Sequence, residues 1–197
     1  MSRHAQPARR TARRCHPLVT AAAAAVGFVS VAQGATFNVS WDGAAAGSYN
    51  TAVNWSTNTV PLNSDVLNDF YNVTINRAGG ANVIGNLSQI EILNLTIGAN
   101  AGNQLTLADN CTFNITGTAT FGPSTVNNSG TIQLGQTASA ASQFRFLGST
   151  NTLTGGGTIS LIGANTNFFS SGTLTSNNTI VGFGNISTNF AFVSNGT

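Results

Sequence analysis

Charged and thiol side chains are few in this chain, and after residue 35 they comprise five acids, two arginines and one cysteine, with no histidine or lysine. Without histidine, that stretch can build neither a Ser-His-Asp triad nor an imidazole metal site. Hydrolysis of a polysaccharide would instead require two carboxylates that face one groove. Glu91 and Asp109 stand about one repeat apart and form the pair that could share a face. We therefore expect no catalytic residues, with a polysaccharide hydrolase or lyase as the remaining enzymatic alternative.

A metal site is conceivable only in the segment Asn63–Asp69. Its Asp65, Asn68 and Asp69 offer the hard oxygen ligands that Ca²⁺ prefers. Their spacing matches no calcium-binding loop, and hydrogen bonding in a turn or cap is the favoured alternative. We expect neither a resident metal nor a cofactor.

The tryptophans and tyrosines gather in one short stretch, which offers a possible sugar-binding platform. They are Trp41, Tyr49, Trp55 and Tyr71. Packing inside a cap is the commoner fate of such side chains and is favoured here. Four phenylalanines further on are predicted to form a stacked core ladder: Phe144, Phe146, Phe168 and Phe169.

Residues 1–35 have the pattern of a secretory signal peptide. A cationic start with five arginines precedes the apolar run Leu18–Val29, and the small residues Ala32–Ala35 follow. Removal of this segment leaves two arginines against five acids, a net charge of −3, which argues against a nucleic-acid partner. No later segment is long and apolar enough for a transmembrane helix. The mature chain is therefore expected outside the cell or at its surface. Its one cysteine, Cys111, cannot form a disulfide within the chain, so we expect it either buried in a strand as a free thiol or bonded to another chain.

Alternation of apolar and polar residues predicts many short strands after the signal peptide. The pattern changes phase between Ile92 and Leu93. A second regularity is a Gly/Asn-Thr-Ile repeat whose threonines fall at 131, 158, 179 and 197. A period of about twenty residues is typical of a parallel β-solenoid and predicts about seven coils.

The scarcity of charge follows from the same geometry. Equivalent residues of successive coils would stack about 4.8 Å apart, so columns of like charge would repel, whereas asparagine and threonine can hydrogen-bond along the stack. The aromatic-rich residues 36–76 are predicted to form an N-terminal cap, and residues 77–197 the repeats. The last copy breaks off at Asn195–Thr197, so the repeats are expected to continue in a longer protein.

Several of these segments resemble bacterial exported proteins with autotransporter-type passenger repeats, and surface proteins with C-terminal sorting tags. They are Trp41-Asp42, Asn54–Ser56, Val60-Pro61, Asp65-Val66, Leu93–Ile97, Thr152–Ile159 and Thr173–Ile186. The resemblance implies a right-handed parallel β-helix at the cell surface, often adhesive, with no shared catalytic residues. We therefore expect a non-catalytic, structural or adhesin-like β-helix whose partners are extracellular glycans or other surface proteins. A carbohydrate-binding or polysaccharide-processing β-helix is the alternative.

Overall fold

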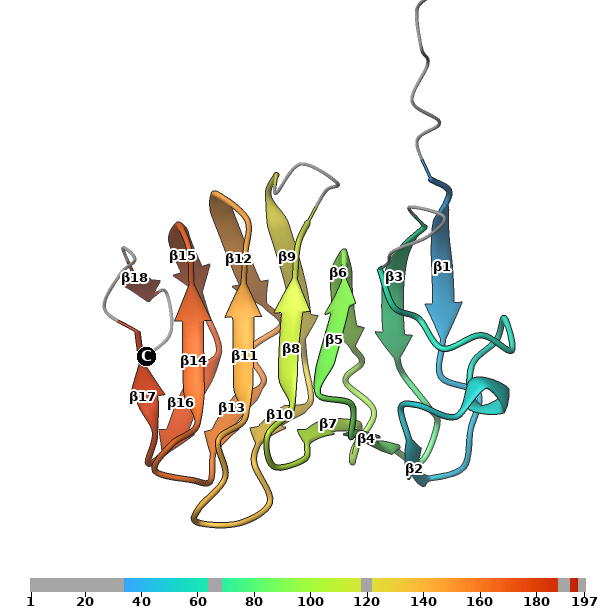
Figure 1. Cartoon of the computed structure of the whole chain (residues 1–197), viewed down its shortest axis with the longest axis horizontal. Helices are drawn as coiled ribbons and strands as arrows, with labels where there is room; N and C mark the ends of the chain where they lie inside the picture. The colour runs from blue at the N-terminus through green and yellow to red at the C-terminus, as the bar shows by residue number, and fades with distance from the viewer. Residues whose placement is uncertain (1–33, 64–68, 118–121, 188–191, 195–197) are drawn as a thin grey trace, which may run out of the picture. The chain divides into compact units, whose positions relative to one another are not determined.

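The computed structural model of the protein describes residues 34–63, 69–117, 122–187 and 192–194 (Figure 1). The predicted signal peptide lies almost wholly outside the described residues. From Thr36 onward the chain forms strands that assemble into three parallel sheets, here named sheets I, II and III.

From β3 onward, each sheet contains every third strand of the chain, which is the topology of a parallel β-helix. Sheet I contains β1 (Thr36–Ser40), β3 (Phe70–Ile75), β6 (Asn94–Ile97), β9 (Ser124–Asn128), β12 (Thr150–Thr154), β15 (Thr173–Ser176) and β18 (Phe192–Ser194). Sheet II contains β2 (Ala46–Ser48), β4 (Asn82–Gly85), β7 (Gln104–Leu107), β10 (Thr131–Leu134), β13 (Thr158–Leu161) and β16 (Thr179–Gly182). Sheet III contains β5 (Gln89–Ile92), β8 (Thr112–Ile115), β11 (Gln143–Phe146), β14 (Asn167–Ser170) and β17 (Asn185–Ile186). The predicted all-β, parallel β-helix is confirmed.

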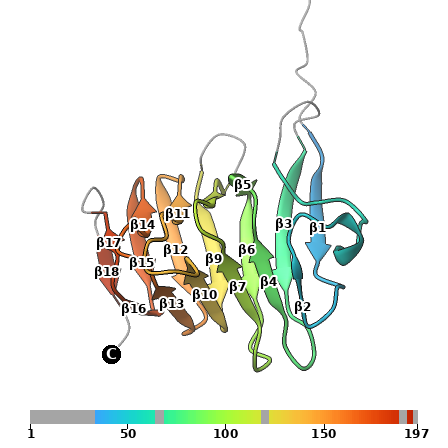
Figure 2. The ribbon, with the colours of Figure 1, turned by 60° about the horizontal axis from the view of Figure 1, so that its bottom comes forward.

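The sequence repeat corresponds to the register of the strands. Thr131, Thr158 and Thr179 lie opposite one another in adjacent strands of sheet II. Figure 2 shows the strands of this sheet side by side in the order of the chain. The predicted phase change after Ile92 is the corner between β5 and β6. The fourth threonine of the repeat, Thr197, lies outside the described residues.

The coils are less uniform than the repeat indicates. In sheet I the positions 38, 72, 94, 125, 152, 175 and 193 stack, so the intervals are 34, 22, 31, 27, 23 and 18 residues. The described residues hold five coils with a strand in all three sheets, from β3–β4–β5 to β15–β16–β17, where about seven had been predicted. The count differs because loops of unequal length join the strands, and because sheet III has no strand beside β1 and β2.

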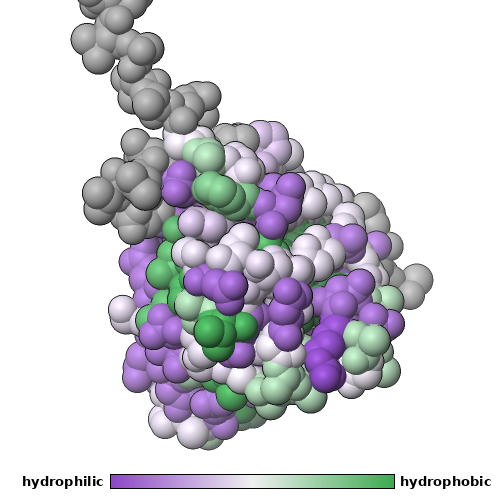
Figure 3. All heavy atoms as spheres, turned by 90° about the vertical axis from the view of Figure 1, so that its right-hand side faces the viewer, coloured by the Kyte–Doolittle hydropathy of each residue, from purple (hydrophilic) through white to green (hydrophobic). Residues whose placement is uncertain are grey.

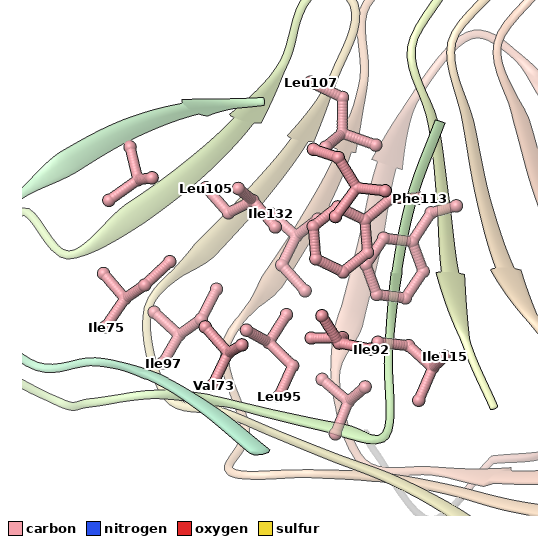
Figure 4. Packing of buried hydrophobic residues seen from close by; sticks show 14 of the residues in the cluster. Val73, Ile75, Ile92, Leu95, Ile97, Leu105, Leu107, Phe113, Ile115 and Ile132 are labelled. Carbon is pink, nitrogen blue, oxygen red and sulfur yellow. The ribbon is translucent and has the colours of Figure 1, made fainter. Parts of the chain in front are cut away.

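The core is a set of columns along the inside of the coils. In sheet II the inward column contains Val83, Leu105, Ile132 and Ile159, each with no exposed surface. Figure 4 shows side chains from all three sheets converging in the interior. Burial of such aliphatic side chains contributes about 1.5–3 kcal/mol each to folding.

The corners between sheets use residues that tolerate a left-handed backbone. Gly155 has a φ of 98° directly after β12, and a Cβ there would collide with the carbonyl group of Asn128 in the coil below. Because only glycine adopts this conformation without strain and leaves this space, the coils can stack closely at that corner.

Candidate binding face on the third sheet

The four aromatic residues considered as a sugar platform are buried at the N-terminal end of the β-helix. The exposed fractions of Trp41, Tyr49, Trp55 and Tyr71 are 4%, 0%, 1% and 8%. The ring of Trp55 packs edge-on against both Trp41 and Tyr49, with centroids 5.1 and 4.8 Å apart. Stacking on a sugar requires an exposed ring face. Trp41, Tyr49 and Trp55 instead cover one another, and Tyr71 stacks on Phe37, with ring centroids 5.5 Å apart.

Hydrogen bonds fix this aromatic cluster to nearby backbone. The indole N–H of Trp55 donates to the Tyr49 carbonyl at 2.8 Å, and the Tyr49 hydroxyl donates to the Pro61 carbonyl at 2.7 Å. The Trp41 indole fits because β2 has a glycine at its inward position: a Cβ on Gly47 would lie 3.1 Å from that ring. The cluster therefore closes the end of the core, as the favoured alternative predicted. Figure 3 shows that end of the molecule, where hydrophilic and near-neutral residues cover most of the surface.

The possible calcium ligands are only partly described. Asp65 and Asn68 lie outside the described residues. Asp69 accepts a hydrogen bond from the backbone N–H of Ala35 at 3.2 Å. Within the described ranges, no three His, Cys, Asp or Glu residues are grouped as a metal site would require.

The two carboxylates weighed for catalysis occupy different structural positions. Glu91 projects outward from β5, level with Asn114 of β8. Asp109 lies in the turn before β8, where it accepts hydrogen bonds from the Thr137 hydroxyl at 2.6 Å and the Gln136 N–H at 2.9 Å. The Thr137 bond, followed by the Gln136 bond, lowers the pKa of Asp109. This carboxylate therefore anchors the loop of the next coil.

Cys111 is a free thiol with 1% of its surface exposed. Burial raises its pKa to about 12. Since the thiolate is the reactive form, this side chain acts as a small core residue.

Charge divides the three sheets. Sheets I and II contain no charged residue in any of their strands, whereas sheet III contains Glu91 and Arg145. The outward side chains of sheet III form two columns, here called the sheet III face. One column comprises Gln89, Thr112, Gln143, Asn167 and Asn185, and the other comprises Glu91, Asn114, Arg145 and Phe169. In Figure 1 the strands of this sheet are nearest the viewer.

Within the part of the chain that the structure describes, Glu91 and Arg145 form no ion pair. Glu91 of β5 and Arg145 of β11 lie on either side of Asn114 of β8. Because one strand separates them, their backbones are roughly 10 Å apart. Arg145 instead lies over the ring of Phe169, 5.3 Å from its centroid. Asn114 between them is 4% exposed, and its Oδ1 has no hydrogen-bond partner.

The sequence alone did not indicate that the residues of the charged column lie opposite one another in adjacent strands. Intervals of 23 and 31 residues separate Glu91, Asn114 and Arg145, which an approximate period of twenty does not place in one column. Phe169, predicted as part of the core ladder, points outward instead, while Phe113, Phe144 and Phe168 form the stacked ladder, with centroids 5.5 and 6.1 Å apart. The register of sheet III reverses the role of Phe169 because neighbours in a strand face opposite sides.

No protein-family model, curated protein or solved structure matches the chain. The parallel β-helix architecture is therefore the basis for any functional argument. No helix in the described part of the chain has the length and apolar character needed to cross a bilayer.

Proposed function

We propose that this chain is a non-catalytic, exported β-helix that serves a structural, adhesin-like role in a bacterial surface or secreted protein. The observation that carries the proposal is how sheets I and II use their outward polar side chains. In sheet I, Asn94 donates to Asn72 at 2.9 Å, and Asn72 donates to Asn38 at 3.0 Å. These amides bond to their counterparts in the next coil, so they stabilise the stack of coils.

Sheet II follows the same arrangement. The Thr106 hydroxyl donates to Asn82 at 2.8 Å, and the amide of Gln104 donates to Thr106 at 2.7 Å and to Gln133 at 3.4 Å. A regular, uncharged stack held by its own side chains suits a scaffold that holds its form outside the cell. The pattern of residues 1–35 supports export.

Export is tested by producing the full chain in a bacterial host and determining the N-terminus of the product outside the cytoplasm. We expect a mature chain that begins close to Thr36. A matched variant, Ala23→Asp, places a charge in the apolar run and should leave the uncut chain in the cytoplasm. Retention of the unaltered chain inside the cell would overturn the proposal.

The structural role is tested by removing one coil. Thr131 and Thr158 occupy equivalent positions, so deletion of residues 131–157 joins two coils in register. Because coils of a solenoid contact only their neighbours, the shortened protein should fold and be exported. A matched deletion of residues 131–150 breaks the register and should not fold. Loss of folding in the in-register variant alone would contradict the modular role.

A further inference from the structure

Among the described residues, the sheet III face differs from the other two outer faces in two ways: its strands contain charged residues, and its side chains form no hydrogen bonds between coils such as those in sheets I and II. Its side chains make no described hydrogen bond to one another; the one that is bonded is Asn167, whose amide donates to the Asn165 carbonyl at 3.0 Å. Glu91 and Arg145, the only charged residues in any described strand, also make no ion pair with each other. Apart from Asn114, which is buried, the side chains of this face are therefore partly or fully exposed to solvent.

The composition of the sheet III face defines the chemistry that it can recognise. The Glu91 carboxylate only accepts hydrogen bonds, the Arg145 guanidinium only donates them, and the amides of Gln89 and Gln143 do both. The buried Oδ1 of Asn114 is an acceptor without a donor. The edge of the Phe169 ring adds an apolar contact.

We propose that the sheet III face binds an extracellular polysaccharide whose chain crosses the strands. This inference rests on the proposed function, since it assumes that the face is exposed outside the cell. Each sugar hydroxyl both donates and accepts, and the C–H groups of a sugar ring can pack beside Phe169. Side chains that recur about every 4.8 Å along the sheet provide repeated contacts for a repeating polymer.

Other polymers fit this face less well. Nucleic acid requires a cationic surface, and the chain after residue 35 has two arginines against five acids. A peptide that adds as a strand requires a sheet edge, whereas these residues lie on the flat side of the sheet.

The experiment uses the mature full-length protein and affinity electrophoresis through gels that contain defined polysaccharides: a β-glucan, a mannan, a xylan, polygalacturonate and alginate. We expect at least one of them to retard the protein. The near-isosteric variants Glu91→Gln and Arg145→Gln should each weaken that binding about tenfold, because each removes a charged hydrogen-bonding partner.

The matched control is the double variant Gln104→Ala and Gln133→Ala on the outer face of sheet II, which should bind as the unaltered protein does. Thermal unfolding of every variant verifies that it is folded. Failure of all five polysaccharides to retard the protein, or equal loss of binding in the sheet II control, would overturn the inference. Export without binding would refute this inference alone, whereas binding by a chain that is not exported would refute the proposed function alone.

Discussion

The two ends of the β-helix differ in how the core meets solvent. At the N-terminal end, Tyr49 and Trp55 are 0% and 1% exposed and are hydrogen-bonded to backbone. At the C-terminal end, the inward column of sheet III runs from Phe144 through Phe168, both fully buried, to Ile186, which is 45% exposed. Within the described residues, the same kind of core position is therefore buried at one end, here called the closed end, and exposed at the other, here called the open end.

Two further features distinguish the C-terminal coils. In sheet II the inward residue of the last coil, Ile180, is only partly buried, whereas Val83, Leu105, Ile132 and Ile159 of the same column have no exposed surface. In sheet I the inward positions of the later strands include Asn128, Asn151 and Ser176, whereas β3 and β6 have only apolar residues there. Since each coil is stabilised mainly by its neighbours, the final coil should be the least stable part of the described structure.

The largest effect is expected from Trp55→Ala at the closed end. The substitution removes a fully packed side chain and leaves the Tyr49 carbonyl without its donor, so unfolding should become easier by about 3–5 kcal/mol. Urea denaturation of the mature protein measures this change. The control is Phe183→Ala at the open end, where a side chain 59% exposed should contribute less than about 0.5 kcal/mol. Similar losses from both substitutions would mean that the two ends do not differ energetically.

The reactivity of Cys111 reports whether the core next to the aromatic cluster is closed to solvent. Its pKa of about 12 keeps the thiol protonated at pH 8, so alkylation should be slower by on the order of a hundredfold or more than in urea-unfolded protein. Trp55→Ala should accelerate labelling, and Phe183→Ala should not. Rapid labelling of the native, unaltered protein would contradict a closed end.

The raised pKa of the same thiol predicts that the free energy of unfolding falls at alkaline pH. A pKa that is raised in the folded state contributes stability that is fully present below the unfolded pKa of about 8.5. That contribution is lost as the pH rises towards about 12. Cys111→Ala should therefore flatten the decline in the free energy of unfolding between those pH values, measured by urea titration at each pH.

A smaller effect is expected when the aromatic cluster keeps its shape but loses one hydrogen bond. Tyr49→Phe removes the hydroxyl that donates to Pro61 and leaves that carbonyl unpaired, at a cost of about 1–3 kcal/mol. Thermal and urea unfolding measure the loss. No change would indicate that water replaces the hydroxyl, in which case the cluster seals the end less tightly than its burial indicates.

Much of this architecture was predictable because every strand of a coil must alternate apolar residues that face the core with polar residues that face solvent. The alternation around Ile90 and Leu95 and the threonines at 131, 158 and 179 indicated strands and register directly. The columns of outward side chains could not be predicted, because loops of unequal length make the interval between equivalent positions vary from 18 to 34 residues. For that reason the contact of Arg145 with the ring of Phe169 was not predicted. The burial of Trp55 was predicted, because packing in a core is the commoner fate of large aromatic side chains.

The smallest effect is expected at the open end itself. Ile186 occupies the same column as Phe168 but is 45% exposed, so Ile186→Ala should cost about 1 kcal/mol or less, whereas Phe168→Ala should cost about 3–5 kcal/mol. The two substitutions lie on adjacent strands of one sheet and are compared by urea denaturation under identical conditions. If Ile186→Ala were as costly as Phe168→Ala, Ile186 would have to be covered in solution, and the final coil would then be packed as firmly as the coil before it.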